Sequence, residues 1–280
     1  MEKLIIGEQL LARFAKRLRD EEKSRATVDK YMRDARRFAV YAEARPVDRT
    51  LVLAYKEKLG RDYSARSANS MLAALNSLFR LAGREDLRVR QFRTQKEAYR
   101  SENEELTREE YVRLVTAAER AGDRMTSLLL QTVCGTGIRV SELGFITVEA
   151  ARRGEATVCC KGKTRRIFIV SALREKLLRY AGRNGVTSGP VFLTRFGRPL
   201  DRSNVWRRMK IFCGAAGIPP EKVFPHNLRH LFARTFYENG HDIAALADIL
   251  GHSSVNTTRI YIISTGAEHA KKLEEMGLVT

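Results

Sequence analysis

The chain has 280 residues, of which 51 are Lys or Arg and 33 Asp or Glu, giving a net charge of +18. With 44% hydrophobic residues it has the composition of a folded protein that meets a polyanion, above all nucleic acid, rather than that of a disordered basic tail. An anionic membrane is disfavoured as a partner, because the sequence has neither a long apolar run nor a basic amphipathic N-terminus.

The first ninety residues are predicted to form four helices with short connections. Helical spacing of apolar residues runs through 5–19, 24–43, 48–60 and 64–83, and the last segment ends at Gly83. We interpret residues 1–88 as a small helical DNA-binding domain. Any single Lys or Arg on the polar faces of its helices is equally well explained as an ordinary charge exposed to solvent. Its candidate DNA contacts are Arg33, Arg36, Arg37, Arg66 and Arg80.

A linker is predicted over 89–105, where charges are mixed and aliphatic residues are scarce. Thr107 and Glu110 then match a capping box that starts a new helix, and a second domain follows over 106–280. Within it, EATVCCKGKTRRIFIV (155–170) predicts a β-hairpin with a basic turn. Further helices are expected at 171–183, 202–216, 226–238, 242–250, 254–262 and 267–276.

The terminus and the cysteines indicate a cytoplasmic protein. The apolar run near the N-terminus is too short for a signal peptide. The four cysteines include no CxxC pair, so reduced thiols are expected.

The stretch PHNLRH (225–230) raises the question of a metal site, because His226 and His230 are four residues apart. A zinc-protease helix needs a glutamate after the first histidine, and Asn227 stands there instead. His226 and Arg229 share one helix face behind Pro225, an arrangement suited to phosphate. We therefore expect an anion site and no metal.

Two other motifs can each be explained by local structure alone, without a functional site. In GTGIRVSEL, glycines 135 and 137 are expected to end one helix and Arg139 to open the next, where it could equally be a surface residue paired with Glu142. In LGHSSVNTTRIYI, Gly251 caps a helix before His252, and Tyr261 by itself would be a core aromatic.

Together the three motifs resemble the signature of the tyrosine recombinases, the phage integrase family. Arg139, His226, Arg229, His252 and Tyr261 match it in order and local spacing, as do the flanking stretches GTGIRVSEL, HNLRHLFA and ILGHSSVNTTRIY. The resemblance covers roughly 105–265, while the first half is similar to the family's core-binding domain in size and helix pattern only. It implies a mainly α fold with a small β-hairpin: a helical core-binding domain followed by a mixed catalytic domain.

The resemblance also implies a chemistry. Family members cut one DNA strand with a tyrosine hydroxyl, leaving a 3′-phosphotyrosyl bond and a free 5′-hydroxyl, and they need no cofactor, metal or ATP. Carried over, Tyr261 is the nucleophile, and Arg139 and Arg229 clamp the phosphate. His226 and His252 bond the phosphate or carry protons, His226 being the better candidate for the base, and Glu142 orients the site.

The family protonates the leaving 5′-oxygen with a lysine in a hairpin turn. Lys161 is placed there by counting, and Lys163 remains the alternative, because the outgoing strand lacks the proline that would settle the register. DNA contacts from the second domain are expected from Lys161, Lys163, Arg165, Arg207 and Arg208.

The implied partners are double-stranded DNA at specific sites and further copies of the chain in a tetramer on paired sites, and the resemblance leaves a place for a partner recombinase or accessory factor. The compact two-domain organisation is similar to that of chromosome-dimer resolvases and of simpler mobile-element integrases, with the latter favoured. Two alternatives are a catalytically silent DNA-binding regulator of the same fold and a type IB topoisomerase that relaxes supercoils.

Overall fold

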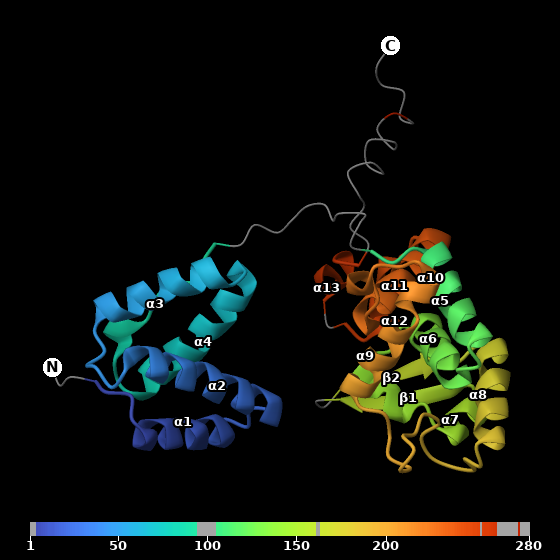
Figure 1. Ribbon diagram of the computed structural model, residues 1–280, viewed down its shortest axis with the longest axis horizontal. Coiled ribbons are helices and arrows are strands. Elements are labelled where there is room, and N and C mark those ends of the chain that lie inside the picture. Colours follow the sequence, from blue (N-terminus) through green and yellow to red (C-terminus); the bar gives the residue numbers. More distant parts are fainter. Residues whose placement is uncertain (1–3, 94–104, 161–162, 253, 262–273, 275–280) are drawn as a thin grey trace. The chain divides into compact units, whose positions relative to one another are not determined.

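The computed structural model describes residues 4–93, 105–160, 163–252, 254–261 and 274, and only the backbone of Cys160 and Lys163. The chain divides into two compact units, 1–96 and 97–280. Both are mainly helical, and the described residues include one two-stranded antiparallel sheet, so the predicted fold class is confirmed (Figure 1). No helix in the described part of the chain is both long and apolar enough to cross a membrane.

The first unit contains the four predicted helices. Ser24, Asp48 and Ser64 act as N-caps, each accepting a hydrogen bond from the backbone N–H three residues on. The apolar faces meet around Phe38, whose ring centroid lies 4.9 Å from that of Tyr55. The elements are α1 (Glu8–Asp20), α2 (Arg25–Ala42), α3 (Arg49–Asp62), α4 (Ala65–Leu81) and the short 3₁₀ helix η1 (Glu85–Leu87).

The segment expected to begin the linker packs on this first unit. Asn76 on α4 exchanges two hydrogen bonds with the backbone of Val89, at 2.9 and 3.0 Å, and Asn69 exchanges two with Phe92, at 2.9 and 2.7 Å. Val89 is buried, and Phe92 lies over Gly60, where a Cβ would approach its ring to 2.9 Å. Two asparagines seven residues apart on one helix face thus bind an extended chain that has little apolar content of its own.

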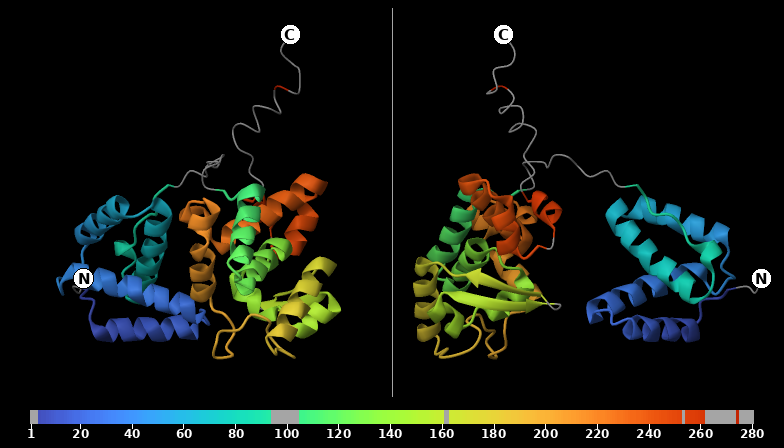
Figure 2. Two further views of the ribbon diagram at one scale, coloured as in Figure 1. Left: turned by 45° about the vertical axis from the view of Figure 1, so that its right-hand side comes forward. Right: turned by 180° about the vertical axis from the view of Figure 1, so that it is seen from behind.

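The second unit is arranged around α6 (Arg124–Thr136), which packs against four other helices, α5, α8, α9 and α11 (Figures 1 and 2). Most of α6 is buried, and its leucines lie in the core of this unit. The other elements are α5 (Arg108–Arg120), η3 (Val140–Phe145), α7 (Val148–Arg153), β1 (Glu155–Cys160), β2 (Lys163–Phe168), α8 (Ser171–Arg183), α9 (Arg202–Ile211), α10 (Cys213–Ala216), η4 (Pro220–Lys222), α11 (Pro225–Gly240), α12 (Ile243–Leu250) and α13 (Val255–Arg259).

Local signals placed several of these elements correctly. Thr107 and Glu110 form both bonds of the capping box, at 3.2 and 2.9 Å. The hairpin is antiparallel, with Cys160 opposite Lys163. The helix predicted at 202–216 is interrupted at Phe212, between α9 and α10. The tail helix expected at 267–276 falls, apart from 274, outside the described residues.

The GTG stretch differs in detail from the prediction. Gly137, with φ of 61°, ends α6, whereas Gly135 lies within that helix. The helix expected to open at Arg139 is the six-residue 3₁₀ helix η3. A left-handed residue at the end of α6 turns the chain sharply, so that Arg139 follows two residues later.

Candidate active site

Five of the predicted site residues come together in the second unit, each close to the end of a helix. Arg139 precedes η3, His226 and Arg229 lie in the first turns of α11, His252 follows the C-cap of α12, and Tyr261 follows α13. Residues spread over more than a hundred positions therefore meet because helix ends converge. Pro225 at the first position of α11 starts that helix immediately before His226.

Tyr261 lies among three histidines. Its ring centroid is 4.3 Å from that of His230, 5.3 Å from that of His252 and 5.4 Å from that of His226. The phenol also packs in a small apolar cluster with Ala233, Leu246 and Leu250, and Tyr261 is 9% exposed. The ring is thus held by apolar side chains and by a group of imidazoles.

Arg229 is a deeply buried charge, with 1% of its surface exposed. It donates to the carbonyls of Gly137 and of Leu250, the latter at 2.7 Å. These carbonyls lie at the C-terminal ends of α6 and α12, where backbone oxygens lack helical partners and carry partial negative charge. Burial and the nearby Arg139 lower the pKa of Arg229 to about 10, which leaves it positive at neutral pH.

The guanidinium of Arg229 also faces the phenol. Its Cζ lies 5.9 Å from the ring centroid of Tyr261. Its buried Nε has no hydrogen-bond partner among the described residues. A fixed cation with an unused donor beside a tyrosine is suited to an oxyanion.

Glu142 is a buried carboxylate held by two arginines. It accepts from the backbone N–H of Arg139 at 2.9 Å and from the Arg139 guanidinium at 3.0 Å, and also from Arg165. Burial would raise the pKa of Glu142, but the hydrogen bonds from Arg139 and Arg165 outweigh it and hold the pKa below its usual value. The carboxylate is therefore charged and fixes the direction of Arg139, whose side chain is 43% exposed.

His252 connects Arg229 to α13. Its Nε2 lies 3.1 Å from Nη2 of Arg229, and its Nδ1 lies 2.8 Å from the hydroxyl of Thr258. Burial first, and then the positive charges of Arg229, Arg139 and Arg165, lower the pKa of His252 to about 4. The imidazole is neutral at physiological pH.

Of the two candidate lysines, the structure describes only the backbone of Lys163. Lys161 lies outside the described residues. Lys163 opens β2 opposite Cys160, with only its backbone described. The choice between them stays as the sequence left it.

The arginines of the second unit that were expected to contact DNA have different surroundings. Arg207 is exposed on α9, whereas Arg208 pairs with Asp123 at 3.3 Å. Arg165 differs from the expectation: its side chain is 10% exposed and points inward, to Glu142 and to the carbonyl of Ile249. Strand alternation places Arg165 on the same face of β2 as the buried Ile167. The run of basic residues around the turn had concealed this inward direction.

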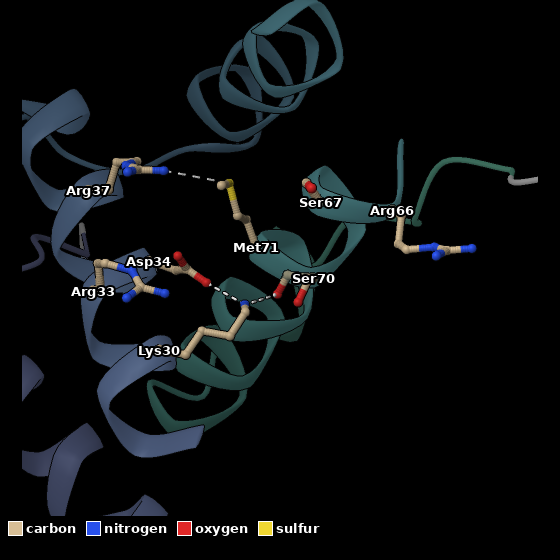
Figure 3. Close-up of a pocket in the computed structure, with 8 residues that line it drawn as sticks. All are labelled: Lys30, Arg33, Asp34, Arg37, Arg66, Ser67, Ser70 and Met71. Atoms are coloured by element: carbon tan, nitrogen blue, oxygen red, sulfur yellow. Dashed lines mark hydrogen bonds and ion pairs between the residues drawn. The ribbon is translucent and has the colours of Figure 1, made fainter. Parts of the chain in front are cut away.

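In the first unit, three of the expected DNA contacts line one cavity of about 450 Å³ between α2 and α4 (Figure 3). They are Arg33, Arg37 and Arg66. Lys30, which also lines it, bonds the buried Asp34 at 2.7 Å and the Ser70 carbonyl at 3.2 Å, so its charge is already compensated. Arg36 is exposed on α2, and Arg80 is exposed and lies 3.8 Å from Glu85.

Three residues of the site were missing from the predicted set or given another role. His230 is 4% exposed and has the ring nearest to Tyr261, and its position one turn after His226 was the available signal. Thr258 anchors His252, but a threonine in a polar stretch gives no sign of this. Arg165 is the third. No three His, Cys, Asp or Glu side chains cluster as metal ligands within the described ranges.

Comparisons with known proteins identify the family of the chain. The model of the phage integrase family matches residues 104–268, and that of the phage integrase N-terminal SAM-like domain matches 11–86. The chain is 32% identical over 294 residues to tyrosine recombinase XerA of Pyrococcus furiosus, covering 98% of this chain and 96% of the relative. It is 30% identical over 284 residues to tyrosine recombinase XerD of Xanthomonas campestris pv. campestris, covering 91% and 88%.

Solved structures show the same fold. A crystal structure of XerA recombinase matches with a TM-score of 0.54 and 25% identity, covering 97% of this chain and 99% of that one. A lambda integrase dimer bound to a COC′ core site matches with a TM-score of 0.76 and 22% identity, covering 93% and 78%. Since the family model spans more than half of the chain and XerA aligns with nearly all of it, the chain belongs to the phage integrase family, that of the tyrosine recombinases.

Proposed function

We propose that the chain is a site-specific DNA recombinase that cuts and rejoins strands through a 3′-phosphotyrosyl intermediate, without a metal ion or ATP. Relatives named tyrosine recombinases and a lambda integrase structure with a core-site DNA support the substrate class. The observation that carries the chemistry is the position of Tyr261, whose ring lies within 5.4 Å of three imidazoles and 5.9 Å from a buried guanidinium.

In the proposed cleavage step, the Tyr261 oxygen attacks the scissile phosphorus. A bond forms between that oxygen and the 3′-phosphate, the bond to the 5′-oxygen breaks, and the 5′-oxygen takes up a proton. The phosphotyrosyl bond retains the free energy of the phosphodiester bond that was broken. A second 5′-hydroxyl can therefore attack it in the reverse reaction and rejoin the strands. No nucleotide hydrolysis is needed.

The two arginines supply the positive charge for this step. Arg229 is buried and bonded to two helix-end carbonyls, so its orientation is set before DNA arrives. Arg139 is aimed by Glu142 and keeps a half-exposed side chain. Donors that need no reorganisation in a site of low dielectric stabilise a phosphoryl transition state most effectively.

A tyrosine hydroxyl is a poor nucleophile while it is protonated, so Tyr261 needs a proton acceptor. The low pKa of His252, about 4, makes it a weak base, and its Nε2 already faces Arg229. His226, exposed in the first turn of α11, is the better base. The proton for the 5′-oxygen comes from Lys161, or in the alternative register from Lys163.

Assembly and DNA contact extend the proposal. A lambda integrase tetramer on a Holliday junction is among the similar folds and supports a tetramer on paired sites for this chain. Arg33, Arg36, Arg37, Arg66, Arg80, Arg207 and Arg208 are proposed to contact phosphates, and a partner recombinase or accessory factor remains part of the proposal. The proposed organisation is a core-binding domain over 1–88, an 89–105 linker whose Val89 and Phe92 pack on that domain, and a catalytic domain over 106–280.

A nicked suicide half-site duplex tests the proposal, using DNA that flanks the gene. Wild-type protein in EDTA is expected to form a covalent protein–DNA adduct on a denaturing gel. Tyr261→Phe is expected to bind the same duplex and to form none. DNA binding without an adduct by the wild-type protein, on this duplex and on a library of sites, would favour the silent DNA-binding regulator instead.

A further inference from the structure

Arg165 and Arg166 are neighbours on β2 with opposite surroundings. The side chain of Arg165 is 10% exposed and donates to Glu142 and to the carbonyl of Ile249. The side chain of Arg166 is 66% exposed and lies 3.6 Å from Glu155 on the adjacent strand. Successive strand residues point to opposite faces, so one arginine enters the second unit while the other stays in solvent.

Arg165 connects three elements of the site. It reaches from β2 to the carboxylate that holds Arg139, and to the last turn of α12, immediately before His252. The carbonyl of Leu250, the next residue of α12, accepts a hydrogen bond from Arg229. Two guanidiniums thus bind consecutive carbonyls at one helix C-terminus, where acceptors are unsatisfied and the helix dipole favours cations.

The fit around Arg165 is close. A Cβ on Gly251 would lie 2.4 Å from the Arg165 Cδ and 3.2 Å from its Nε. Gly251 also has a φ of 63°, so glycine is required there for two independent reasons. The aliphatic stem of Arg165 therefore occupies a fixed course beside the segment that carries His252.

The charges explain what Arg165 contributes. One carboxylate between two guanidiniums leaves one net positive charge in the cluster. Without Arg165, Glu142 would be neutralised by Arg139 alone, and that pairing would compete with a phosphate for the Arg139 guanidinium. Arg165 satisfies one side of the carboxylate and leaves Arg139 able to bind an anion.

We propose that Arg165 is a positioning residue for strand cleavage, which holds Glu142, and through it Arg139, in the geometry that receives the scissile phosphate, and does not itself contact DNA. The proposal rests on the proposed recombinase function. Arg165 also lies on the hairpin that carries both candidate lysines, so the same contacts fix the base of that turn to α12.

The test compares Arg165→Gln with Arg166→Gln, which removes the same charge from the other face of the same strand. Adduct formation on the suicide duplex is measured at saturating DNA, and duplex affinity is measured across a salt series. Arg165→Gln is expected to slow adduct formation about ten- to a hundred-fold, the range typical of residues that orient a reacting group, with affinity and salt slope unchanged. Arg166→Gln is expected to leave the rate unchanged, and Arg165→Lys to recover part of it.

A second measurement needs neither DNA nor activity. The groups that face His252 are Arg229 and His226 from α11, Arg139 before η3, Arg165 from β2, and Thr258 and Tyr261. Removing the Arg165 charge should raise the pKa of His252, observed by NMR titration of the free protein, whereas Arg166→Gln should not move it. Thermal unfolding of each variant shows whether it is folded, and Arg165→Met, which also lacks the charge but keeps an unbranched apolar stem, replaces Arg165→Gln in both assays if the latter is unfolded.

The outcomes separate the two proposals. A full rate with weaker, less salt-dependent binding in Arg165→Gln would make Arg165 a DNA phosphate contact and overturn the inference. An unmoved His252 titration would overturn it as well. An absent adduct with the wild-type protein would instead count against the recombinase function, while the titration would still report whether Arg165 acts on the site.

Discussion

Nη2 of Arg229 lies 3.1 Å from Nε2 of His252, and this contact assigns the proton of the imidazole. A guanidinium has only donors, so Nε2 must accept, and the ring proton lies on Nδ1. From there it is donated to the hydroxyl of Thr258, 2.8 Å away. Protonation of Nε2 would place two donors face to face, which agrees with the lowered pKa of His252.

Stability should therefore depend on pH through His252. Its pKa is about 4 in the folded protein and about 6.5 when unfolded, so the unfolded chain binds more protons between these values. The free energy of unfolding should fall as the pH is lowered from 7 towards 4, by on the order of 1 kcal/mol at pH 5 from this group. His252→Asn removes this term, so its urea midpoint should differ less from that of wild type at pH 5 than at pH 7.

The matched control is His241→Asn, because His241 is exposed and its left-handed backbone suits asparagine. Its difference from wild type should not change between the two pH values. If the difference in urea midpoint between His252→Asn and wild type were the same at pH 5 and pH 7, the lowered pKa of His252 would be contradicted.

Arg229→Lys should be far from conservative. Nη1 of Arg229 bonds the Gly137 carbonyl while Nη2 bonds the Leu250 carbonyl and His252, and the single nitrogen of an ammonium cannot occupy both positions. We expect a loss of about 1–3 kcal/mol in unfolding free energy and a decrease of at least about 10²-fold in adduct formation. Arg234→Lys, on the same helix but 38% exposed, should change both by little. Equal rates for the two variants would show that Arg229 is not part of the phosphate clamp.

Glu142→Gln should separate catalysis from binding. The amide keeps the shape of the side chain but removes the charge that holds Arg139. Adduct formation at saturating DNA should fall about ten- to a hundred-fold, whereas duplex affinity should stay or rise because a negative charge has left the site. Glu155→Gln, on the outer face of the hairpin, serves as the control. Weaker DNA binding by Glu142→Gln would argue for a disrupted fold instead.

The two glycines of GTG should respond in opposite directions to alanine. At Gly137 a Cβ would lie 2.4 Å from the Phe232 ring, and φ is 61°, so Gly137→Ala should cost about 1–3 kcal/mol and displace a carbonyl that Arg229 uses. Gly135 lies inside α6, with the nearest atom 3.9 Å from its Cβ position. Gly135→Ala should be neutral or stabilising by up to about 1 kcal/mol. Chemical denaturation of both variants is the measurement.

The cavity between α2 and α4 predicts a salt-dependent effect. Arg66→Gln should weaken binding to any duplex and reduce the slope of log affinity against log salt by about 1. Arg17→Gln removes the same charge from α1, where Arg17 pairs with Glu21 at 2.7 Å, and should leave the slope unchanged. Identical slopes for Arg66→Gln and wild type would remove Arg66 from the DNA contacts.

Elements with local signals were predictable from the sequence. The capping box at Thr107, the hairpin and the helix stop at Gly137 each depend on residues within a few positions, where short-range sterics and hydrogen bonding decide the conformation. The linker start was less predictable, because Val89 and Phe92 are held by asparagines of α4 more than ten residues away.

The types of the proposed catalytic residues and their order along the chain are properties of the sequence by itself. What only the tertiary structure decided is which charges turn inward. Arg165 and Arg166 are chemically identical neighbours, yet one meets Glu142 and Ile249, distant in the chain, while the other meets solvent. A buried guanidinium is stable only where acceptors such as a carboxylate or helix-end carbonyls are brought to it, and that depends on how separate helices pack rather than on any local pattern.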